Sequence, residues 1–258
     1  MNALSRRPGF PARLGTGSAP RSHHFAPRRA APVAAPQPVV RDAIAARARM
    51  IERLMAGGIT DEALLRALGA VDRRHFVDSA LALRAYDDDA LPIGMGQTIS
   101  KPSIVARMVQ LLVQGGVRTP DGGRLGRVLE IGTGCGYQAV LLGQLAAEVY
   151  SIERLRALHE KARTNLRPLR VPNVHMILGD GMAGYPAGAP YAGIIAAAGG
   201  EAVPAAWVEQ LAVGGRIVAP VAQAGGAQAL VVIDKTMHGI THRVLEAVHF
   251  VPLKSGVS

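Results

Sequence analysis

Three glycines follow a short apolar run in the middle of the chain, and their spacing is suited to holding a ligand. Residues 128–137 read VLEIGTGCGY, with glycine at 132, 134 and 136. Glycine lets the backbone turn sharply and approach a ligand closely at the carboxyl end of a strand. The dinucleotide fingerprint GxGxxG needs glycine at 137, where the chain has tyrosine. The loop therefore predicts a ligand that lacks a pyrophosphate.

An acidic residue lies about twenty positions beyond the first glycine, at the end of the next predicted strand. This residue is Glu153, whose carboxylate can accept hydrogen bonds from both hydroxyls of a ribose. The order strand, GxGxG, helix, strand and acid predicts a site for S-adenosyl-L-methionine. Its predicted cofactor contacts are Glu130, Gly132, Thr133, Gly134, Cys135, Gly136 and Glu153. The alternative is a glycine loop that only packs a helix, beside a surface glutamate.

Asp180 and Gly181 follow the third predicted strand and reach the same edge of the sheet. This position resembles the one that meets the adenine in methyltransferases, so both residues are predicted cofactor contacts. The alternative is a simple Asp-Gly turn. No signature of an activating base accompanies Cys135, so we interpret it as a small loop residue that contacts the cofactor and not as a nucleophile.

The glycine loop belongs to a series of strands that alternate with helices. Short β-rich runs occupy residues 127–131, 149–152, 174–178, 193–197 and 216–221, with helical patterns between most of them. This alternation predicts an α/β fold, a doubly wound and mostly parallel Rossmann-like methyltransferase sheet of seven strands. Two late runs, 229–233 and 247–251, lack a clear helix between them and predict a hairpin that places an antiparallel strand at the sheet edge.

The segment before the glycine loop predicts an N-terminal helical cap. Apolar residues recur at helical spacing from Asp42, and Gly57-Gly58 ends that pattern. Thr60 is the predicted N-cap of a second helix, and residues 103–112 form a third. The intervening stretch around residues 86–96 reads as loop.

Composition separates a tail, 1–40, from a methyltransferase domain, 41–258. Residues 1–41 hold seven arginines and no acid, so the net charge of +10 leaves only +3 for the rest. The tail is rich in Pro, Ala and Arg, and we predict that it is disordered. The mildly basic body and the 4% aromatic content argue against a specific nucleic-acid partner. The single cysteine is typical of a reducing compartment, and no apolar run is long enough for a membrane span, so we predict a cytoplasmic protein.

Several segments together resemble one family of methyltransferases. They are ALPIGMGQTISKP (90–102), RRHFVD (73–78), Tyr86-Asp87-Asp88, LEIGTGCGYQ, GDG (179–181) and VHFVPL (248–253). Together they closely resemble the protein-L-isoaspartate O-methyltransferases, over the chain from about Arg41 onward. GQTIS is the most specific segment, because general methyltransferases lack it.

The resemblance implies transfer of a methyl group to the free α-carboxylate of L-isoaspartyl residues in damaged proteins and peptides. It places Ser100 beside the acceptor carboxylate as the predicted catalytic residue, and Gln97, Thr98 and Ile99 in a segment that closes over the cofactor. The alternative for Ser100 is that it caps the following helix. Asp87-Asp88-Asp89 could suggest a metal, but we interpret this run as a solvated turn in which Asp88 aligns with a structural acid, and no metal is predicted. Lys254 and Val105 replace residues that other members use near the cofactor, so no role is carried over to them.

Two other functions remain open at this point. One is a class I methyltransferase acting on RNA or a small molecule, against which GQTIS argues. The other is a non-enzymatic nucleic-acid binder that uses the basic tail, against which the glycine loop and Glu153 argue. The oligomeric state is not predicted.

Overall fold

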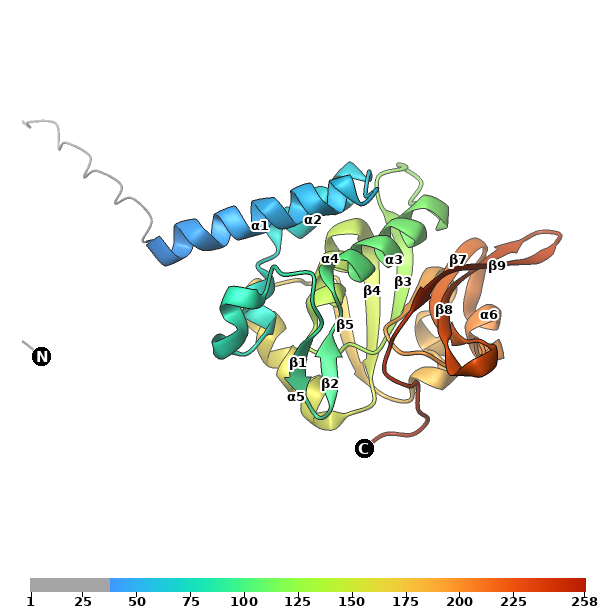
Figure 1. Ribbon diagram of the computed structural model, residues 1–258. Coiled ribbons are helices and arrows are strands. Elements are labelled where there is room, and N and C mark those ends of the chain that lie inside the picture. The colour runs from blue at the N-terminus through green and yellow to red at the C-terminus, as the bar shows by residue number, and fades with distance from the viewer. Residues whose placement is uncertain (1–37) are drawn as a thin grey trace, which may run out of the picture. The chain divides into compact units, whose positions relative to one another are not determined.

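The computed structural model describes residues 38–258 and contains one seven-stranded sheet (Figure 1). The predicted disorder of the tail, 1–40, concerns residues that lie outside this range except for the last three, which begin a helix. The strands run in the order β5-β4-β3-β6-β7-β8-β9 across the sheet. Their bounds are β3 (Leu125–Ile131), β4 (Ala146–Glu153), β5 (Val174–Leu178), β6 (Tyr191–Ala196), β7 (Leu211–Ala222), β8 (Gln228–Thr236) and β9 (Gly239–Val248).

The predicted α/β fold is confirmed, because β3 to β7 are mutually parallel and a hairpin ends the sheet. The reversed strand is β8, which pairs antiparallel with both β7 and β9 and so lies next to the edge rather than at it. The edge strand β9 spans 239–248, not the predicted 247–251. Most of its side chains are exposed on both faces, so the sequence shows no alternating apolar pattern there.

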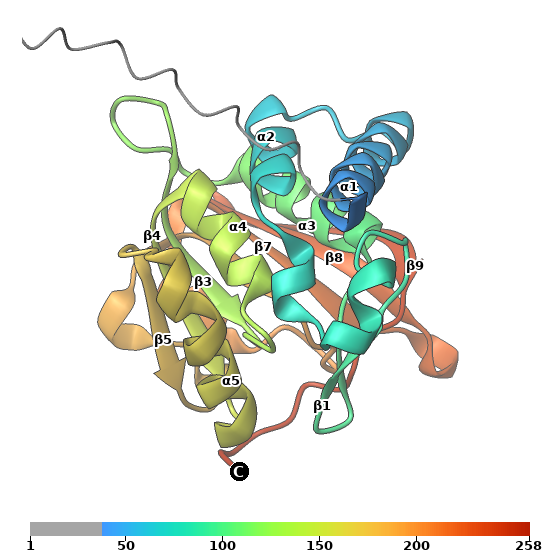
Figure 2. The same cartoon turned by 90° about the vertical axis from the view of Figure 1, so that its left-hand side faces the viewer.

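Helices cover both faces of the sheet. Helices α3, α4 and α5 contact the strands on one face, and the short α6 packs on β7 from the other. Helices α1 and α2 lie outside α3 and α4 as the predicted cap (Figure 2). The helices are α1 (Pro38–Ala56), α2 (Glu62–Ala70), α3 (Pro102–Gly115), α4 (Tyr137–Leu145), α5 (Arg156–Leu166) and α6 (Ala205–Gln210). The 3-10 turns are η1 (Arg73–Phe76), η2 (Ser79–Arg84), η3 (Arg167–Leu169), η4 (Gly181–Ala183), η5 (Pro186–Gly188) and η6 (Ala224–Gly226).

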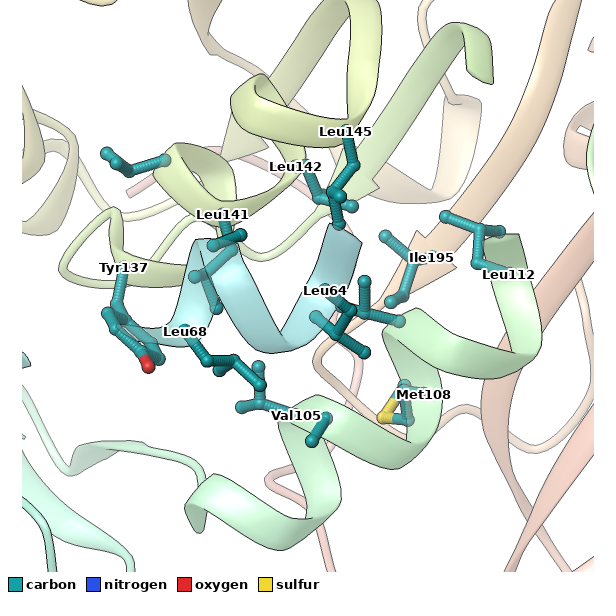
Figure 3. Close-up of a cluster of buried hydrophobic side chains, with 14 of the residues drawn as sticks. Leu64, Leu68, Val105, Met108, Leu112, Tyr137, Leu141, Leu142, Leu145 and Ile195 are labelled. Carbon is teal, nitrogen blue, oxygen red and sulfur yellow. The ribbon is translucent and has the colours of Figure 1, made fainter. Parts of the chain in front are cut away.

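The larger apolar core joins the cap to the sheet (Figure 3). Leu64 and Leu68 of α2 meet side chains of α3 and α4, and Ile195 of β6 joins the same cluster from the sheet. A second cluster on the opposite face is built around Trp207 of α6. The cap thereby fixes α3 and α4, the two helices whose first turns approach the carboxyl edge of the sheet.

Two local expectations in the cap need correction. The N-cap of α2 is Asp61, whose Oδ1 accepts the N–H of Leu64 at 2.8 Å, and not Thr60. Gln110 Oε1 accepts the N–H groups of both Thr60 and Asp61, so the helix begins one residue later than expected. The stretch expected as loop contains an antiparallel hairpin of β1 (Leu91–Gly94) and β2 (Gln97–Ile99). Its turn at Met95-Gly96 has positive φ at both residues. Glycine favours this backbone, but methionine does not, so the residue types did not predict the turn.

The sheet order fixes where a ligand can bind. Strand β3 lies between β4 and β6, so the chain winds away from β3 in both directions. In open parallel sheets, ligands bind at the carboxyl ends of the strands beside such a switch point. The β1–β2 hairpin and the C-terminal segment both reach this end (Figures 1 and 2). No helix within residues 38–258 has the length and apolar character to cross a membrane.

Candidate active site

A cavity of about 400 Å³ opens at the carboxyl ends of β3 and β4. Its walls come from the β1–β2 hairpin, the glycine loop after β3, the residues that follow β4, and the C-terminal segment 251–254. The volume lies in the range of small-molecule sites. Four segments that are distant in the sequence therefore form one pocket.

Most of the predicted site residues line this one cavity. They are Gln97, Thr98, Ile99, Ser100, Gly132, Thr133, Gly134, Cys135, Glu153 and Gly181. Glu130, Gly136 and Asp180 lie outside its wall. The structure thus brings the GQTIS segment and the glycine loop face to face, as two sides of the same pocket.

The glycine loop has a backbone that only glycine adopts readily. Gly132, Gly134 and Gly136 have φ of 90°, 57° and 90°. A Cβ on Gly136 would lie 2.4 Å from Leu166 Cδ1, so α5 packs directly on this residue. Asn165 of α5 also donates to the Cys135 carbonyl at 3.0 Å. Gly136 therefore shapes the loop from behind, without meeting the cavity.

The carboxylate of Glu153 is tied to the backbone on both sides of the pocket. Its Oε2 accepts the N–H of Gly134 and its Oε1 accepts the N–H of Leu155, each at 2.9 Å. The residue is 5% exposed. Each oxygen retains a lone pair, which suits two ribose hydroxyls. The donor set and the open glycine backbone fit an adenosyl ligand.

Glu130 lies one layer behind the cavity, fully buried between β3, β4 and α4. Its carboxyl group accepts hydrogen bonds from Gln138 Nε2, at 3.0 Å, and from the Ser151 hydroxyl. Ser151 in turn is 2.6 Å from Thr133 Oγ1. Burial raises the pKa of Glu130 to about 8. Gln138 and Thr133 both line the cavity, so Glu130 contacts the wall through Gln138 and, by way of Ser151, through Thr133.

Asp180 faces the C-terminal segment and not the cavity. Its Oδ1 accepts the N–H of Met182 and its Oδ2 accepts the N–H of Gly256, at 2.9 and 2.7 Å. This geometry matches the alternative of an Asp-Gly turn. The neighbouring Gly181 does line the cavity, and its carbonyl accepts Trp207 Nε1 at 2.8 Å.

The C-terminal segment closes one rim of the pocket. Residues 251–254 line the cavity, and Leu253 N donates to the Gly199 carbonyl at 2.8 Å. Farther along, Ser258 exchanges backbone hydrogen bonds with Arg154 and Arg156, at 2.9 and 2.8 Å. This rim therefore depends on residues at the far end of the chain from the hairpin.

Ser100 ends the hairpin segment and is half-buried at the cavity wall. Its carbonyl accepts Arg73 Nη2 at 2.7 Å. The N-cap of α3 is Lys101, and Asp88 rather than Ser100 supplies the cap, since its Oδ1 accepts Ser103 N at 2.8 Å. The alternative that Ser100 caps the helix is thereby removed. Lys161 Nζ donates to the Ile93 carbonyl at 2.8 Å, which ties the hairpin to α5.

The cavity offers no obvious base. Burial raises the pKa of Cys135 to about 11 and that of Tyr137 to about 12, so both stay protonated at neutral pH. Glu153 is the one carboxylate among the described lining residues, and it is held by backbone N–H groups. Such a site suits an acceptor that needs no deprotonation.

The acidic run at residues 87–89 makes contacts within the protein. Asp88 caps α3, and Asp87 and Asp89 pair with Arg84 at the surface. Within residues 38–258 no three His, Cys, Asp or Glu side chains gather into a metal site. His75 is exposed, and its Nε2 lies 2.7 Å from the Asn165 carbonyl.

Sequence reasoning missed several residues of the pocket wall. They include Ile93, Met95, Tyr137, Gln138, Arg154, Leu155, Leu158, Ala197 and Ala198. The helix that follows the glycine loop signals Tyr137 and Gln138, because its first turn must face the same ligand. Ala197 and Ala198 follow β6, the other neighbour of β3, which the strand order alone reveals.

Comparisons with known proteins agree on one family. The family model described as Protein-L-isoaspartate(D-aspartate) O-methyltransferase matches residues 45–258. A Protein-L-isoaspartate O-methyltransferase of Leptothrix cholodnii is 60% identical over 215 residues, covering 82% of this chain and 74% of the relative. The protein of the same name from Methylibium petroleiphilum is 57% identical over 212 residues, covering 81% and 77%.

Solved structures share the fold. One titled protein-L-isoaspartate O-methyltransferase is 26% identical with a TM-score of 0.72, over 82% of this chain and 67% of the other. A Plasmodium falciparum structure, titled as a putative protein-L-isoaspartate O-methyltransferase in complex with S-adenosyl-L-homocysteine, is 23% identical. Its TM-score is 0.67, and the match covers 80% of this chain and 97% of the other.

Proposed function

The chain belongs to the protein-L-isoaspartate(D-aspartate) O-methyltransferase family, and we infer that its cavity brings S-adenosyl-L-methionine and an isoaspartyl carboxylate together. The enzyme transfers a methyl group to the free α-carboxylate of L-isoaspartyl residues in damaged proteins and peptides. When bound, S-adenosylmethionine supplies a methyl group on a positively charged sulfonium sulfur, which departs as a neutral thioether. The alternative of an RNA or small-molecule methyltransferase is not supported, because the family model spans nearly all of the domain.

The chemistry asks little of the protein beyond alignment. A main-chain carboxylate has an ordinary pKa of about 3.3–3.7, so it is ionised at neutral pH and needs no general base. Positioning two reactants can contribute on the order of 7–11 kcal/mol. Cys135 and Tyr137, whose raised pKa values keep them protonated at neutral pH, supply no base, which agrees with this demand.

We propose separate tasks for the two sides of the pocket. Glu153 and the backbone of residues 132–135 bind the adenosyl part of the methyl donor, and Glu130 holds Gln138 and Thr133 in place behind it. Gln97, Thr98 and Ile99 cover the donor and exclude water. The Ser100 hydroxyl donates a hydrogen bond that orients one oxygen of the acceptor toward the methyl group. Asp180 and Gly136 support this site from outside the wall.

The observation that carries this proposal is the position of Ser100 across one cavity from Glu153. The test is transfer of labelled methyl from S-adenosylmethionine to an isoaspartyl peptide and to its aspartyl twin. We expect labelling of the isoaspartyl peptide alone. Equal labelling of both peptides, or of neither, would overturn the assignment.

We propose that the enzyme works in the cytoplasm on isoaspartyl-containing proteins and peptides. The single cysteine, buried in the loop, supports a reducing compartment. The modest charge of residues 42–258 supports protein substrates without a nucleic-acid partner. Fractionation of cells, with the activity followed by the peptide assay, tests the location.

A further inference from the structure

Arg73 is a charged side chain with no exposed surface, in the turn η1 directly behind the active-site wall. Its Nη2 donates to the Ser100 carbonyl at 2.7 Å. Its Nε and Nη1 are buried and have no hydrogen-bond partner among the described residues. Burying a charge without an ion pair costs free energy, so a residue of this kind calls for a reason.

The surroundings of Arg73 place its charge close to the cavity. The guanidinium carbon lies 4.9 Å from the centre of the Tyr137 ring, a cation–π geometry. Ser100 and Tyr137, both in contact with Arg73, line the cavity. One residue therefore separates the positive charge from the space in which the acceptor must lie.

The acidic side chains near Arg73 bind other residues. Asp88 is close enough to Arg73 to attract its positive charge. Both oxygens of Asp88, however, accept hydrogen bonds from Ser103, from the N–H at 2.8 Å and from the hydroxyl at 2.7 Å. The neighbouring Arg74 contrasts with Arg73, since it forms an ion pair with Asp72 at 2.6 Å. Within residues 38–258, Arg73 forms no ion pair of its own, and its positive charge is left to act on the cavity.

We propose that Arg73 is a positioning residue for the acceptor: it fixes the main chain of Ser100 and favours an anionic group at the cavity wall beside that serine. The inference rests on the proposed function, which places the isoaspartyl carboxylate there. An anion in the pocket would compensate the buried cation, whereas a neutral ligand would not. Arg73 would thus help the site select the free carboxylate over its neutral counterparts.

The test compares two peptide ligands that differ in charge alone. One carries the isoaspartyl α-carboxylate, and the other carries the α-carboxamide of the same size. Their inhibition or dissociation constants are measured at pH 7 for the full-length enzyme and for Arg73→Gln, Arg73→Lys and Arg74→Gln. Glutamine is polar but has no charge, lysine keeps the charge, and Arg74→Gln at a partly exposed position is the matched control.

We expect the wild type, Arg73→Lys and Arg74→Gln to prefer the carboxylate by at least about tenfold. We expect Arg73→Gln to lose most of that preference, while its Kd for S-adenosylhomocysteine changes less than about threefold. An unchanged preference in Arg73→Gln, or an equal loss for both peptides, would overturn the inference. If Arg73→Gln does not fold, Arg73→Lys decides, because loss of preference in a folded variant that keeps the charge contradicts the proposal and its retention supports it.

Failure of the proposed function gives a different result. In that case the wild type itself would not methylate the isoaspartyl peptide, whatever the residue at position 73.

Discussion

The carboxylate of Glu153 accepts a hydrogen bond from the backbone N–H of Gly134 at 2.9 Å. The acid at the end of β4 is therefore fastened to the middle of the loop that follows β3. The two elements that the sequence suggested separately, a glycine loop and a distant acid, form one rigid corner of the cavity.

We expect Glu153→Gln to weaken S-adenosylhomocysteine binding by about 10- to 100-fold. The amide has one acceptor oxygen, so either Gly134 N or Leu155 N loses its partner, a loss of about 1–3 kcal/mol for a buried donor. Titration calorimetry measures the Kd. Glu160→Gln, an exposed position on α5, is the control and should bind normally. Normal binding by Glu153→Gln would show that the carboxylate does not hold the ligand.

Ser100→Ala should lower kcat/KM for the isoaspartyl peptide by about 3- to 10-fold, the effect of one lost hydrogen bond of about 0.5–1.5 kcal/mol. The Kd for S-adenosylhomocysteine should stay within twofold of the wild type. Steady-state kinetics and calorimetry separate the two effects. Collapse of cofactor binding instead would reassign the serine to the donor side, and Ser79→Ala on the surface controls for general damage.

Glu130 should make stability depend on pH. The folded state keeps its proton up to a pKa of about 8, whereas the unfolded carboxyl releases it near its ordinary value of 4.5. The native state thus binds more protons between these values, and the stability that this provides is lost as pH rises toward 8. Thermal melts of the wild type and Glu130→Gln from pH 5 to 9 measure this.

The neutral amide of Glu130→Gln cannot titrate, so the variant should lack this decline. The difference in free energy of unfolding between the two proteins should change by at least about 1 kcal/mol from pH 5 to pH 9, in favour of Glu130→Gln at high pH. Parallel curves for the two proteins would show that Glu130 does not titrate there.

Gly136 and Gly122 form a matched pair for testing the loop. Both have positive φ, 90° and 72°, but an added Cβ at Gly136 meets Leu166 Cδ1 at 2.4 Å and at Gly122 meets nothing within 4 Å. Alanine at either position should lower the free energy of unfolding by about 1–2 kcal/mol through backbone strain. At Gly136 we expect a further decrease of about 1–3 kcal/mol, because the methyl group overpacks against α5. Chemical denaturation measures both, and equal costs would show that α5 yields to the methyl group.

Deleting residues 1–37 should leave kcat/KM for the isoaspartyl peptide within about twofold. Within residues 38–258 the walls of the cavity come from residues 93–254, and the cap helix α1 begins at Pro38. The peptide assay compares the full-length and shortened chains. A large loss of activity would show that the basic tail contributes to substrate binding.

The sequence predicts best where a local pattern determines the structure. Strand β5 matched its predicted bounds, because an apolar run between polar turns is plain in the sequence. The β1–β2 hairpin was missed, because its short strands and glycine-rich turn resemble a loop until the partners pair. The contribution of residues 251–254 arises from contacts with Gly199, a relation that no local pattern carries.

The site shows the same division. The glycine loop, Glu153 and the GQTIS segment could be identified from residue types and spacing, and they line one cavity. Asp180 could not be resolved, since an Asp-Gly turn and an adenine contact have the same sequence. The structure turns its carboxylate to Gly256, which depends on the path of the distant chain end. Arg73 belongs to the RRHFVD segment of the family resemblance, but its charge could not be recognised as buried, because burial is visible only in three dimensions.

The rim formed by residues 251–258 has a consequence for how the enzyme is made. The glycine loop and Glu153 leave the ribosome well before Ser258, whose backbone pairs with Arg154 and Arg156. A nascent chain can form strands β3 to β7 before it can enclose a ligand. Stabilisation by the methyl donor is therefore expected to become available only once residues 251–258 have emerged and the pocket is whole.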